Sequence, residues 1–502
     1  MDNHRSYLYL LSFLEGASVM SCELIGAKLL APYFGTSLYV WAAALGLTLG
    51  GLMLGYFSGG LASKRWAGNV KLLFSVLIMA GFFLAIMPFT SHYVMKATLF
   101  MNLQTGAMLS LLVFMVPPLL FMGMTSPIII NLLTRQAQDA GSSAGSVYAI
   151  STLGGIGATF LLGFYIIPTF GITQPAVING ILLALLPTAS LLRRSNWQQA
   201  VPAILLLVSM VYLSFQPVQS ANAAVLYKSE GVLGQVKVVD FPIYGNNQPD
   251  KSGRALIVNR TMQTVMDLSD PTIDYWQYTH YIPEIASFLP TNSKALLLGM
   301  GGGTLVRRLL NKGLDVEAVE IDERIKEVAI RFFNLPPEQE VIVDDARHYL
   351  KVTPNTYDLI IFDTFKGESA PEHVITLEGL QDAKQKLSKD GLILVNFYGY
   401  LDGSLGLLTR SVYKTLSTAG FNTIVLATPG TPDTRNIVLL AYQDQLPASL
   451  DALRNKSLNV VQNIDTNDAL LLTDEQPRLH LYARAAVQWR KLYNKYFVEQ
   501  FD

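Results

Sequence analysis

The sequence predicts two parts of different fold class: a polytopic α-helical membrane domain, followed by an α/β domain with a parallel, doubly wound sheet. Two observations support this division. Residues 7–216 contain seven apolar stretches, each close to the roughly 20 residues that cross a bilayer as a helix. From residue 295 onwards, short apolar runs alternate with helical patterns, which is typical of a parallel sheet with helices on both faces.

The composition agrees with a partly lipid-embedded chain and excludes several function classes. Of the 502 residues, 51% are hydrophobic and only 15% are charged, and the mean hydropathy is +0.33. The net charge of −1 excludes nucleic-acid binding by bulk electrostatics. The single cysteine, Cys22, excludes an intrachain disulfide and a cysteine metal cluster, and the six histidines lack ligand spacing. We therefore expect no metal and no nucleic-acid partner.

The membrane domain is predicted over residues 1–220, with about seven helices. Glycine is dense in the second and fifth apolar stretches, and small residues at such spacing allow close helix packing in lipid. Pro117, Pro118 and Pro127 are expected to break the fourth stretch. The predicted spans are 7–31, 37–62, 70–90, 105–130, 145–168, 172–192 and 199–216.

The first span carries three ionisable residues, Glu15, Glu23 and Lys28. Such groups are costly in lipid and usually face the bundle interior or a polar cavity. Glu23 is therefore a candidate substrate contact, and the alternative is that it pairs with Lys28 and only holds the bundle together. Glu15 lies closer to an end of the predicted span, and we expect it to snorkel towards the membrane surface.

A small β-region is predicted over 221–268, because alternating segments are interrupted there by glycine and proline. Asp270 and Pro271 are predicted to open a helix as its N-cap and first residue. The α/β domain is placed at 269–445, and a C-terminal helical tail at 446–502.

The most informative motif is the predicted strand, glycine turn and helix that begin at residue 295. Backbone amides of such a turn can approach a ligand closely, and an acid about 20 residues later can hold a ribose diol. That acid is Glu320. Asp344, Asp345 and Asp363 follow later predicted strands, and one of the first two is expected to cap a helix. The glycines of the turn are Gly299, Gly301, Gly302 and Gly303.

Residues from about 225 to 400 resemble spermidine synthase, the aminopropyltransferase that uses decarboxylated S-adenosylmethionine. The matching features are GMGGG, VEID, DDA and YDLIIFD, together with Gln235, Gln263 and Tyr278. The helical half resembles the major-facilitator-like multi-span module fused to such domains in bacteria. Its matching segments are ELIGAKLLAPYFGTSLYVWA, PPLLFMGMTSP and AGSVYAISTLGGIGATFLLGFYIIPTFG. The resemblance implies a Rossmann-like, class I methyltransferase-type fold and a bacterial inner (plasma) membrane location.

The resemblance also implies roles for individual residues. The co-substrate is S-adenosylmethionine or its decarboxylated form. The glycine turn approaches its methionine portion, Glu320 holds the ribose, Asp345 and Ala346 meet the adenine, and Gln235 contacts the same ligand. Asp363 is the implied catalytic acid-base group, since an ammonium nucleophile must lose a proton before it attacks. Gln263 and Tyr278 are implied substrate contacts.

Three departures from the family pattern concern the acceptor. Thr279 and His280 stand where His and Glu usually follow the tyrosine, Gly302 replaces an aspartate, and Lys366 aligns with another aspartate. The lost groups include acids that seat a cationic diamine, and a lysine repels one. We therefore expect a rebuilt acceptor site, with His280 and Lys366 as candidate contacts. The expected acceptor is a small molecule other than putrescine, or a membrane-associated one.

Two other functions stay open from the sequence: an ordinary polyamine aminopropyltransferase tethered to the membrane, and a transporter or sensor of polyamines or nucleosides. The expected partners are the lipid bilayer and the acceptor, and a homodimer is an open alternative. Basic residues gather in the loops that share a side with the N-terminus, which predicts a cytoplasmic N-terminus. With seven spans, the C-terminal domain then faces the periplasm. An even number of spans, for instance with two passes in residues 96–133 or one re-entrant segment, would place it in the cytoplasm.

Overall fold

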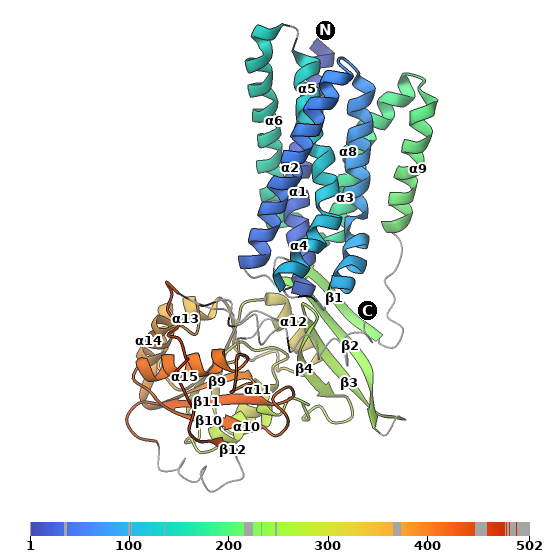
Figure 1. The fold of residues 1–502 in the computed structure, drawn as a ribbon. Coiled ribbons are helices and arrows are strands. Elements are labelled where there is room, and N and C mark those ends of the chain that lie inside the picture. Colours follow the sequence, from blue (N-terminus) through green and yellow to red (C-terminus); the bar gives the residue numbers. More distant parts are fainter. Residues whose placement is uncertain are drawn as a thin grey trace. The chain divides into compact units, whose positions relative to one another are not determined.

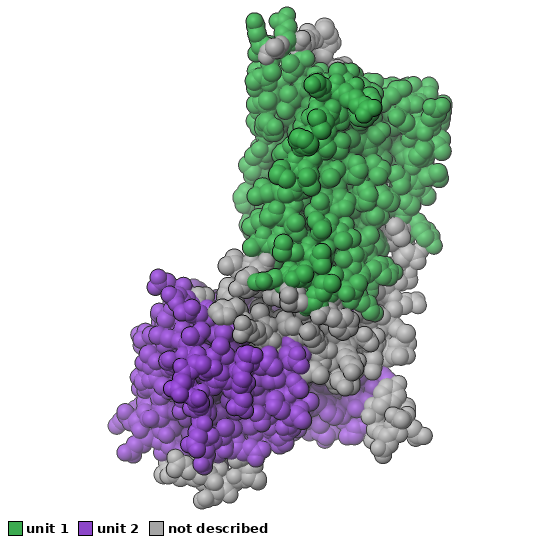
Figure 2. All heavy atoms as spheres, viewed as in Figure 1, with its two compact units in different colours: residues 1–218, 229–235 green, residues 219–228, 236–502 purple. Residues whose placement is uncertain are grey.

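The computed structural model describes residues 2–34, 38–98, 101, 103–134, 136–214, 224–231, 233–245, 248–364, 373–446, 459–476, 478, 481 and 488. The chain forms two compact units (Figure 2). Unit 1 comprises Met1–Val218 and Ser229–Gln235, and unit 2 comprises Gln219–Lys228 and Val236–Asp502.

Unit 1 is built from helices that run side by side (Figure 1). The closest pairs are α1 with α6, α2 with α5, and α3 with α8. A π-helical turn, Leu162–Ile166, joins α6 to α7. The helices are α1 Asp2–Phe34, α2 Leu38–Arg65, α3 Val70–Thr98, α4 Leu103–Phe114, α5 Val116–Leu133, α6 Ala140–Leu161, α7 Ile167–Phe170, α8 Thr173–Arg193 and α9 Trp197–Ser214.

Six helical segments of the described chain are long and apolar enough to cross a membrane. The predicted fourth span is divided at Met115 into α4 and α5, next to Pro117 and Pro118, so the break predicted there is confirmed. The break predicted at Pro127 is wrong, since this residue lies inside α5. The 12 residues of α4 extend for roughly 18 Å, less than the roughly 30 Å of a bilayer core. The apolar part of α9 is also shorter than a span, so the count of seven spans stays a prediction.

Glycines hold two helix pairs close together. A Cβ atom at Gly154 of α6 would lie 2.1 Å from the carbonyl oxygen of Phe13 in α1, and one at Gly55 of α2 would lie 2.4 Å from that of Leu120 in α5. Close packing is thus confirmed at these positions. A Cβ atom at other glycines of α2, α6 and the π-helical turn would meet no atom within 4 Å among the described residues, and these glycines include Gly46, Gly50, Gly157 and Gly163.

The expectation that Glu15 snorkels to the membrane surface is wrong. Its residue is 2% exposed, and the Ser151 hydroxyl of α6 donates a 3.0 Å hydrogen bond to Glu15 Oε2. The physical reason is that α1 begins at Asp2, which places Glu15 roughly 20 Å along the helix. Lys28 Nζ lies 5.9 Å from the centroid of the Trp41 ring, and Glu23 is partly buried.

The β-region forms a four-stranded sheet in the order β1-β2-β3-β4, in which β2, β3 and β4 pair antiparallel, as predicted. Its side chains alternate between two cores: Val238 and Leu256 pack towards the large sheet, whereas Val239 and Ala255 form a small separate cluster. The strands are β1 Ala224–Gly231, β2 Gly234–Gly245, β3 Gln248–Val258 and β4 Thr261–Asp267.

The large sheet of unit 2 has eight strands in the order β12-β10-β11-β9-β8-β5-β6-β7. The run from β9 to β7 is parallel, as predicted, whereas β11, β10 and β12 pair antiparallel. The purely parallel prediction is thus wrong at this edge, because β10 and β11 form a hairpin without a crossover helix. The strands are β5 Lys294–Leu298, β6 Asp315–Glu320, β7 Val341–Val343, β8 Tyr357–Phe362, β9 Leu387–Tyr398, β10 Asn422–Ala427, β11 Asn436–Tyr442 and β12 Asn459–Val461.

Helices cover both faces of this sheet (Figure 1), which makes a three-layer, Rossmann-like domain. One core contains side chains from α10, α11 and α12, and the other contains side chains from α13, α14 and α15. Strand β12 lies within the segment predicted as a helical tail, and most of residues 477–502 lie outside the described residues. The helices are α10 Tyr278–Ala286, α11 Thr304–Asn311, α12 Glu323–Phe332, α13 Ala346–Val352, α14 Leu377–Gln385 and α15 Leu407–Thr418.

The predicted helix start at Asp270 is wrong, since α10 begins at Tyr278. The Asp270 side chain accepts hydrogen bonds from the backbone amide and hydroxyl of Thr272, and Asp274 accepts one from the amide of Trp276. Short acidic side chains that bind nearby amides in this way favour turns over helix.

Replacement of Gly154 by Ala is expected to destabilise unit 1 by about 1–3 kcal/mol, because the added methyl group meets the backbone of α1 and the helices must separate. Gly157→Ala on the same helix is the matched control, since its methyl group meets nothing. The measurement is the thermal loss of helical circular dichroism in detergent. Equal midpoints for the two variants would contradict the packing described.

Candidate active site

The candidate site lies where β5, β6, β7 and β8 end, side by side at one edge of the large sheet. The amide of Gly299 donates to the Val319 carbonyl at 2.9 Å, and the amide of Asp363 donates to the Leu298 carbonyl at 2.8 Å. These bonds bring the glycine turn, the end of β6 and the end of β8 together. Strand order reverses between β5 and β8, and ligands of open α/β sheets bind at such a point.

The glycine turn depends on the absence of side chains at two positions. Gly299 has φ +87°, and a Cβ atom there would lie 2.3 Å from the carbonyl oxygen of Asp363. At Gly302, a Cβ atom would lie 2.8 Å from the side chain of Thr264 in β4, whose hydroxyl oxygen accepts a 2.8 Å hydrogen bond from the Gly302 amide. The β-region therefore fixes the turn from outside the large sheet.

Glu320 ends β6 and is 6% exposed. The amide of Met300 in the glycine turn donates to Glu320 Oε2 at 3.2 Å, and the amide of Asp322 donates to Oε1 at 3.1 Å. These two amides hold the Glu320 side chain in place at the carboxyl end of β6.

Asp363 follows β8 and receives two side-chain hydrogen bonds. Tyr278 Oη donates to Oδ2 at 3.1 Å, and Asn396 Nδ2 donates to Oδ1 at 2.9 Å. Burial raises the pKa of Asp363 to about 6; the Asn396 and Tyr278 bonds oppose this rise, and the nearby Glu320 carboxylate adds to it. A carboxyl group with such a pKa can both take and return a proton near neutral pH.

Asn396 in β9 and Asn436 in β11 form a support for Asp363 that our sequence analysis missed. Asn436 Nδ2 donates to Asn396 Oδ1 at 3.1 Å, which orients the Asn396 amide so that its nitrogen faces Asp363. Both asparagines are buried. The available signal was a polar residue within or beside an apolar run, in GLILVNF and NIVLLAY.

Asp345 is the N-cap of α13, which confirms that one acid of the Asp344–Asp345 pair caps a helix. Its Oδ1 accepts the amides of Arg347 and His348, and its Oδ2 lies 2.9 Å from His373 Nε2. These bonds lower the pKa of Asp345 to about 2, the His373 contact most of all. Ala346, the first residue of α13, is buried against the second core. The adenine contact expected of both residues stays a prediction.

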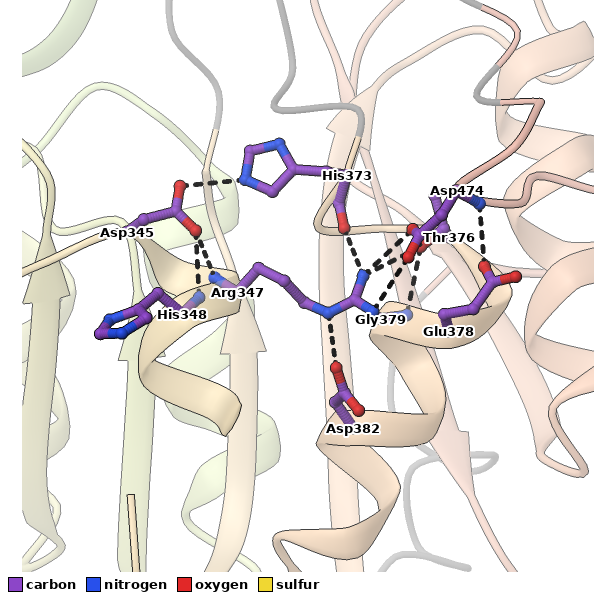
Figure 3. A network of polar contacts seen from close by, with 9 residues as sticks. All are labelled: Asp345, Arg347, His348, His373, Thr376, Glu378, Gly379, Asp382 and Asp474. Carbon is purple, nitrogen blue, oxygen red and sulfur yellow. Dashed lines mark hydrogen bonds and ion pairs between the residues drawn. The ribbon is translucent and has the colours of Figure 1, made fainter. Parts of the chain in front are cut away.

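A buried arginine ties this edge of the domain together (Figure 3). Arg347 Nε donates to Asp382 at 2.6 Å, and its Nη1 donates to the His373 carbonyl at 2.6 Å. Asp474 accepts from Arg347 Nη2 at 3.2 Å and from the Thr376 hydroxyl at 2.6 Å. The network joins α13, α14 and the segment around Asp474, and it was not predicted from the sequence.

Other predicted site residues have different surroundings. His280 contacts Arg308 and the Asp274 carbonyl, each at 3.2 Å. Gln263 is the extra residue of a β-bulge, since Leu256 pairs with Thr264 and Ile257 with Met262. Gln235 belongs to unit 1, where its side chain donates to Glu230 at 3.0 Å, and Lys366 lies outside the described residues.

Asp274 was also missed as a residue that positions the turn. It is almost fully buried, and the hydroxyl of Thr304, the first residue of α11, donates to it at 2.8 Å. Within the described ranges, no group of three or more His, Cys, Asp or Glu residues could hold a metal ion.

Residues 276–397 match the spermine/spermidine synthase domain family. The chain is 34% identical over 131 residues to a polyamine aminopropyltransferase of Vibrio vulnificus, which covers 25% of this chain and 44% of that protein. It is 28% identical over 192 residues to an N-terminal histidine N-methyltransferase of Emericella nidulans, covering 35% and 34%. The chain thus spans less than half the length of these relatives.

A probable spermidine synthase structure from Corynebacterium glutamicum is also similar to the chain. It has 18% identity and a TM-score of 0.39, and the match covers 52% of this chain and 97% of that one. The family match assigns residues 276–397 to a spermine/spermidine synthase-type domain.

Replacement of Asp345 by Ala is expected to speed amide hydrogen exchange in α13 about fivefold at pH 7, because the loss of an N-cap costs about 1 kcal/mol. Asp345→Asn keeps an acceptor at the cap but loses the charge, so its exchange rate is expected to lie between those of the wild type and Asp345→Ala. Since the folded pKa is depressed, the stabilisation by the charge is present above about pH 4 and is lost as the pH falls towards 2. Mass spectrometry of peptides covering α13 measures this, and unchanged exchange in Asp345→Ala would contradict the capping role.

Proposed function

We propose that the chain is a membrane-anchored transferase that moves an alkyl group, most simply an aminopropyl group, from decarboxylated S-adenosylmethionine or S-adenosylmethionine to an amine. The observation that carries this proposal is the pair of carboxylates at the strand ends. Glu320 is held by amides of the glycine turn, and Asp363 has a pKa of about 6 between Tyr278 and Asn396. The family match over residues 276–397 supports it.

The site fits the nucleoside part of such a co-substrate. Ribose hydroxyls need acceptors, and the Glu320 carboxylate is such an acceptor, held at the end of β6 by two backbone amides. The four glycines of the turn Gly299–Gly303 present backbone without side chains at the N-terminus of α11, where a ligand can approach closely, and the Met300 side chain is buried. Asp345 and Ala346, at the start of α13, are the proposed adenine neighbours.

The proposed role of Asp363 follows from the proton balance of the reaction. An ammonium acceptor gives one proton to the Asp363 carboxylate, and the neutral amine then attacks the carbon next to the sulfonium. A C–N bond forms, the C–S bond breaks, and the thioether nucleoside leaves with the electron pair. Tyr278 and Asn396 hold the carboxylate in one orientation throughout.

We propose that the acceptor is not putrescine, or that it is associated with the membrane. The Thr264 side chain lies beside Gly302, where the related synthases carry an aspartate, so an acid at 302 would require Thr264 to move. His280, which replaces a glutamate, contacts Arg308 and a backbone carbonyl. An ordinary spermidine synthase is supported about equally well by the similarity to the Vibrio vulnificus enzyme.

Methyl transfer is a second candidate, because the Emericella nidulans relative is an N-methyltransferase. The two reactions leave different products. Aminopropyl transfer from the decarboxylated co-substrate releases methylthioadenosine, whereas methyl transfer releases S-adenosylhomocysteine. Chromatography of the nucleoside products formed by the purified protein separates these candidates, and the absence of both products would favour a sensor or transporter.

The proposal places the helices of unit 1 in a bacterial inner membrane, supported by six segments of sufficient length and apolarity. The charge bias of the loops favours a periplasmic C-terminal domain if seven helices cross. In that arrangement, the co-substrate made in the cytosol would have to pass through or beside the helices.

Glu320→Ala is expected to weaken methylthioadenosine binding on the order of tenfold or more, since a charge-assisted contact contributes about 1.5–3 kcal/mol. Glu323→Ala is the matched control, because Glu323 is exposed at the start of α12. Calorimetry on the full-length protein in detergent measures both affinities. The ribose role of Glu320 is excluded if its variant binds as tightly as the wild type.

Asp363→Asn is expected to bind methylthioadenosine as the wild type does and to lose turnover, because an amide of the same shape cannot take the proton. The wild-type rate is expected to fall as the pH drops below about 6, where the carboxylate becomes protonated. Product release measured across this pH range tests both expectations. Full turnover by Asp363→Asn would overturn the catalytic role and leave the nucleoside site intact.

A further inference from the structure

A cavity of about 350 Å³ lies within unit 1 among α1, α2 and α6. Glu15 is the acidic residue of its lining, and Tyr56 and Phe160 supply aromatic walls. Ser151 and Met20 complete the part of the lining that bears on the argument. The volume falls within the range of small-molecule sites.

The Glu15 carboxylate accepts a hydrogen bond at one of its two oxygen atoms. Its residue is 2% exposed, and the Ser151 hydroxyl donates to Oε2 at 3.0 Å. Across the described residues, this is the single hydrogen bond of the Glu15 side chain, so Oε1 keeps its acceptor capacity beside the cavity. A carboxylate inside apolar helices costs several kcal/mol unless a cation or further donors approach it.

The other lining residues indicate which kind of ligand the cavity could bind. Lys, Arg and His are absent from the lining residues of the described chain, so the cavity offers one acid without a basic side chain. Tyr56 and Phe160 can face a cation with their rings, and Val19, Met20 and Ile156 suit an alkyl body. A second charge on the ligand would meet apolar walls.

We propose that this cavity binds an amphipathic monocation, a primary or quaternary ammonium with a short apolar body, through Glu15. The ligand can enter from the side of the bundle, because Tyr56, Ile156 and Phe160 are 40%, 51% and 57% exposed. The helices stay closely packed at the base of the cavity, where a Cβ atom at Gly16 would lie 1.9 Å from the Ser151 carbonyl oxygen. This site is separate from the nucleoside site and does not depend on the transfer reaction.

The test uses the full-length protein in lipid nanodiscs and three probes of similar length: n-hexylamine, the neutral n-hexanol and the dication putrescine. Equilibrium dialysis with empty nanodiscs as background measures binding. Hexylammonium is expected to bind most tightly, and Glu15→Gln is expected to weaken it about tenfold or more. Asp139→Asn removes the same charge from an exposed site outside the cavity and is expected to leave the affinity within about twofold.

Ile156→Trp gives a second, independent variant that keeps Glu15 but fills the cavity, and it is also expected to abolish binding. Circular dichroism and gel filtration check that each variant remains folded. Two results overturn the proposal: equal hexylammonium binding by Glu15→Gln and the wild type, or hexanol binding as tight as that of hexylammonium. The second result would mean that the cavity takes apolar chains without using the charge.

Discussion

The close approach of β5 and β8 at Gly299 is the constraint on which the candidate active site depends. A Cβ atom at residue 299 would lie 2.3 Å from the carbonyl oxygen of Asp363, and the φ of this residue is positive. Only glycine allows both. The same turn directs the Met300 amide to Glu320 and the Gly302 amide to Thr264. One backbone conformation therefore links the two acids and the small sheet.

The sequence predicted the two acidic residues of the candidate site, but it did not predict the residues that hold them in position. Glu320 and Asp363 could be identified because they follow apolar runs, and parallel strands bring such positions to one edge. Thr264, Asn396 and Asn436 act through contacts with residues 33 to 40 positions away, and a single sequence does not give the register that creates those contacts. The direction of β11 was missed for a related reason: an apolar run reads the same in a parallel or an antiparallel strand.

The errors in unit 1 and in the β-region have local physical causes. Glycine density predicted close packing, and Gly55 and Gly154 provide it, but spacing alone does not reveal which glycines face a neighbouring helix. The position of Glu15 depended on where α1 begins, which is the least certain feature of an apolar stretch. The helix start at Asp270 failed because acidic side chains there bind backbone amides within turns.

The hydrogen bond from Asn436 to Asn396 has a consequence for how the domain can be divided. Asn436 lies beyond residue 397, where the family match ends, on a hairpin strand that pairs antiparallel with β9. A transplanted segment of 276–397 would carry both acids, yet the Asn396 amide would be free to rotate and present its oxygen to Asp363 in place of its nitrogen. The smallest segment that keeps the orientation of Asp363 is therefore longer than the matched residues 276–397. It includes strand β11 at the antiparallel edge of the sheet.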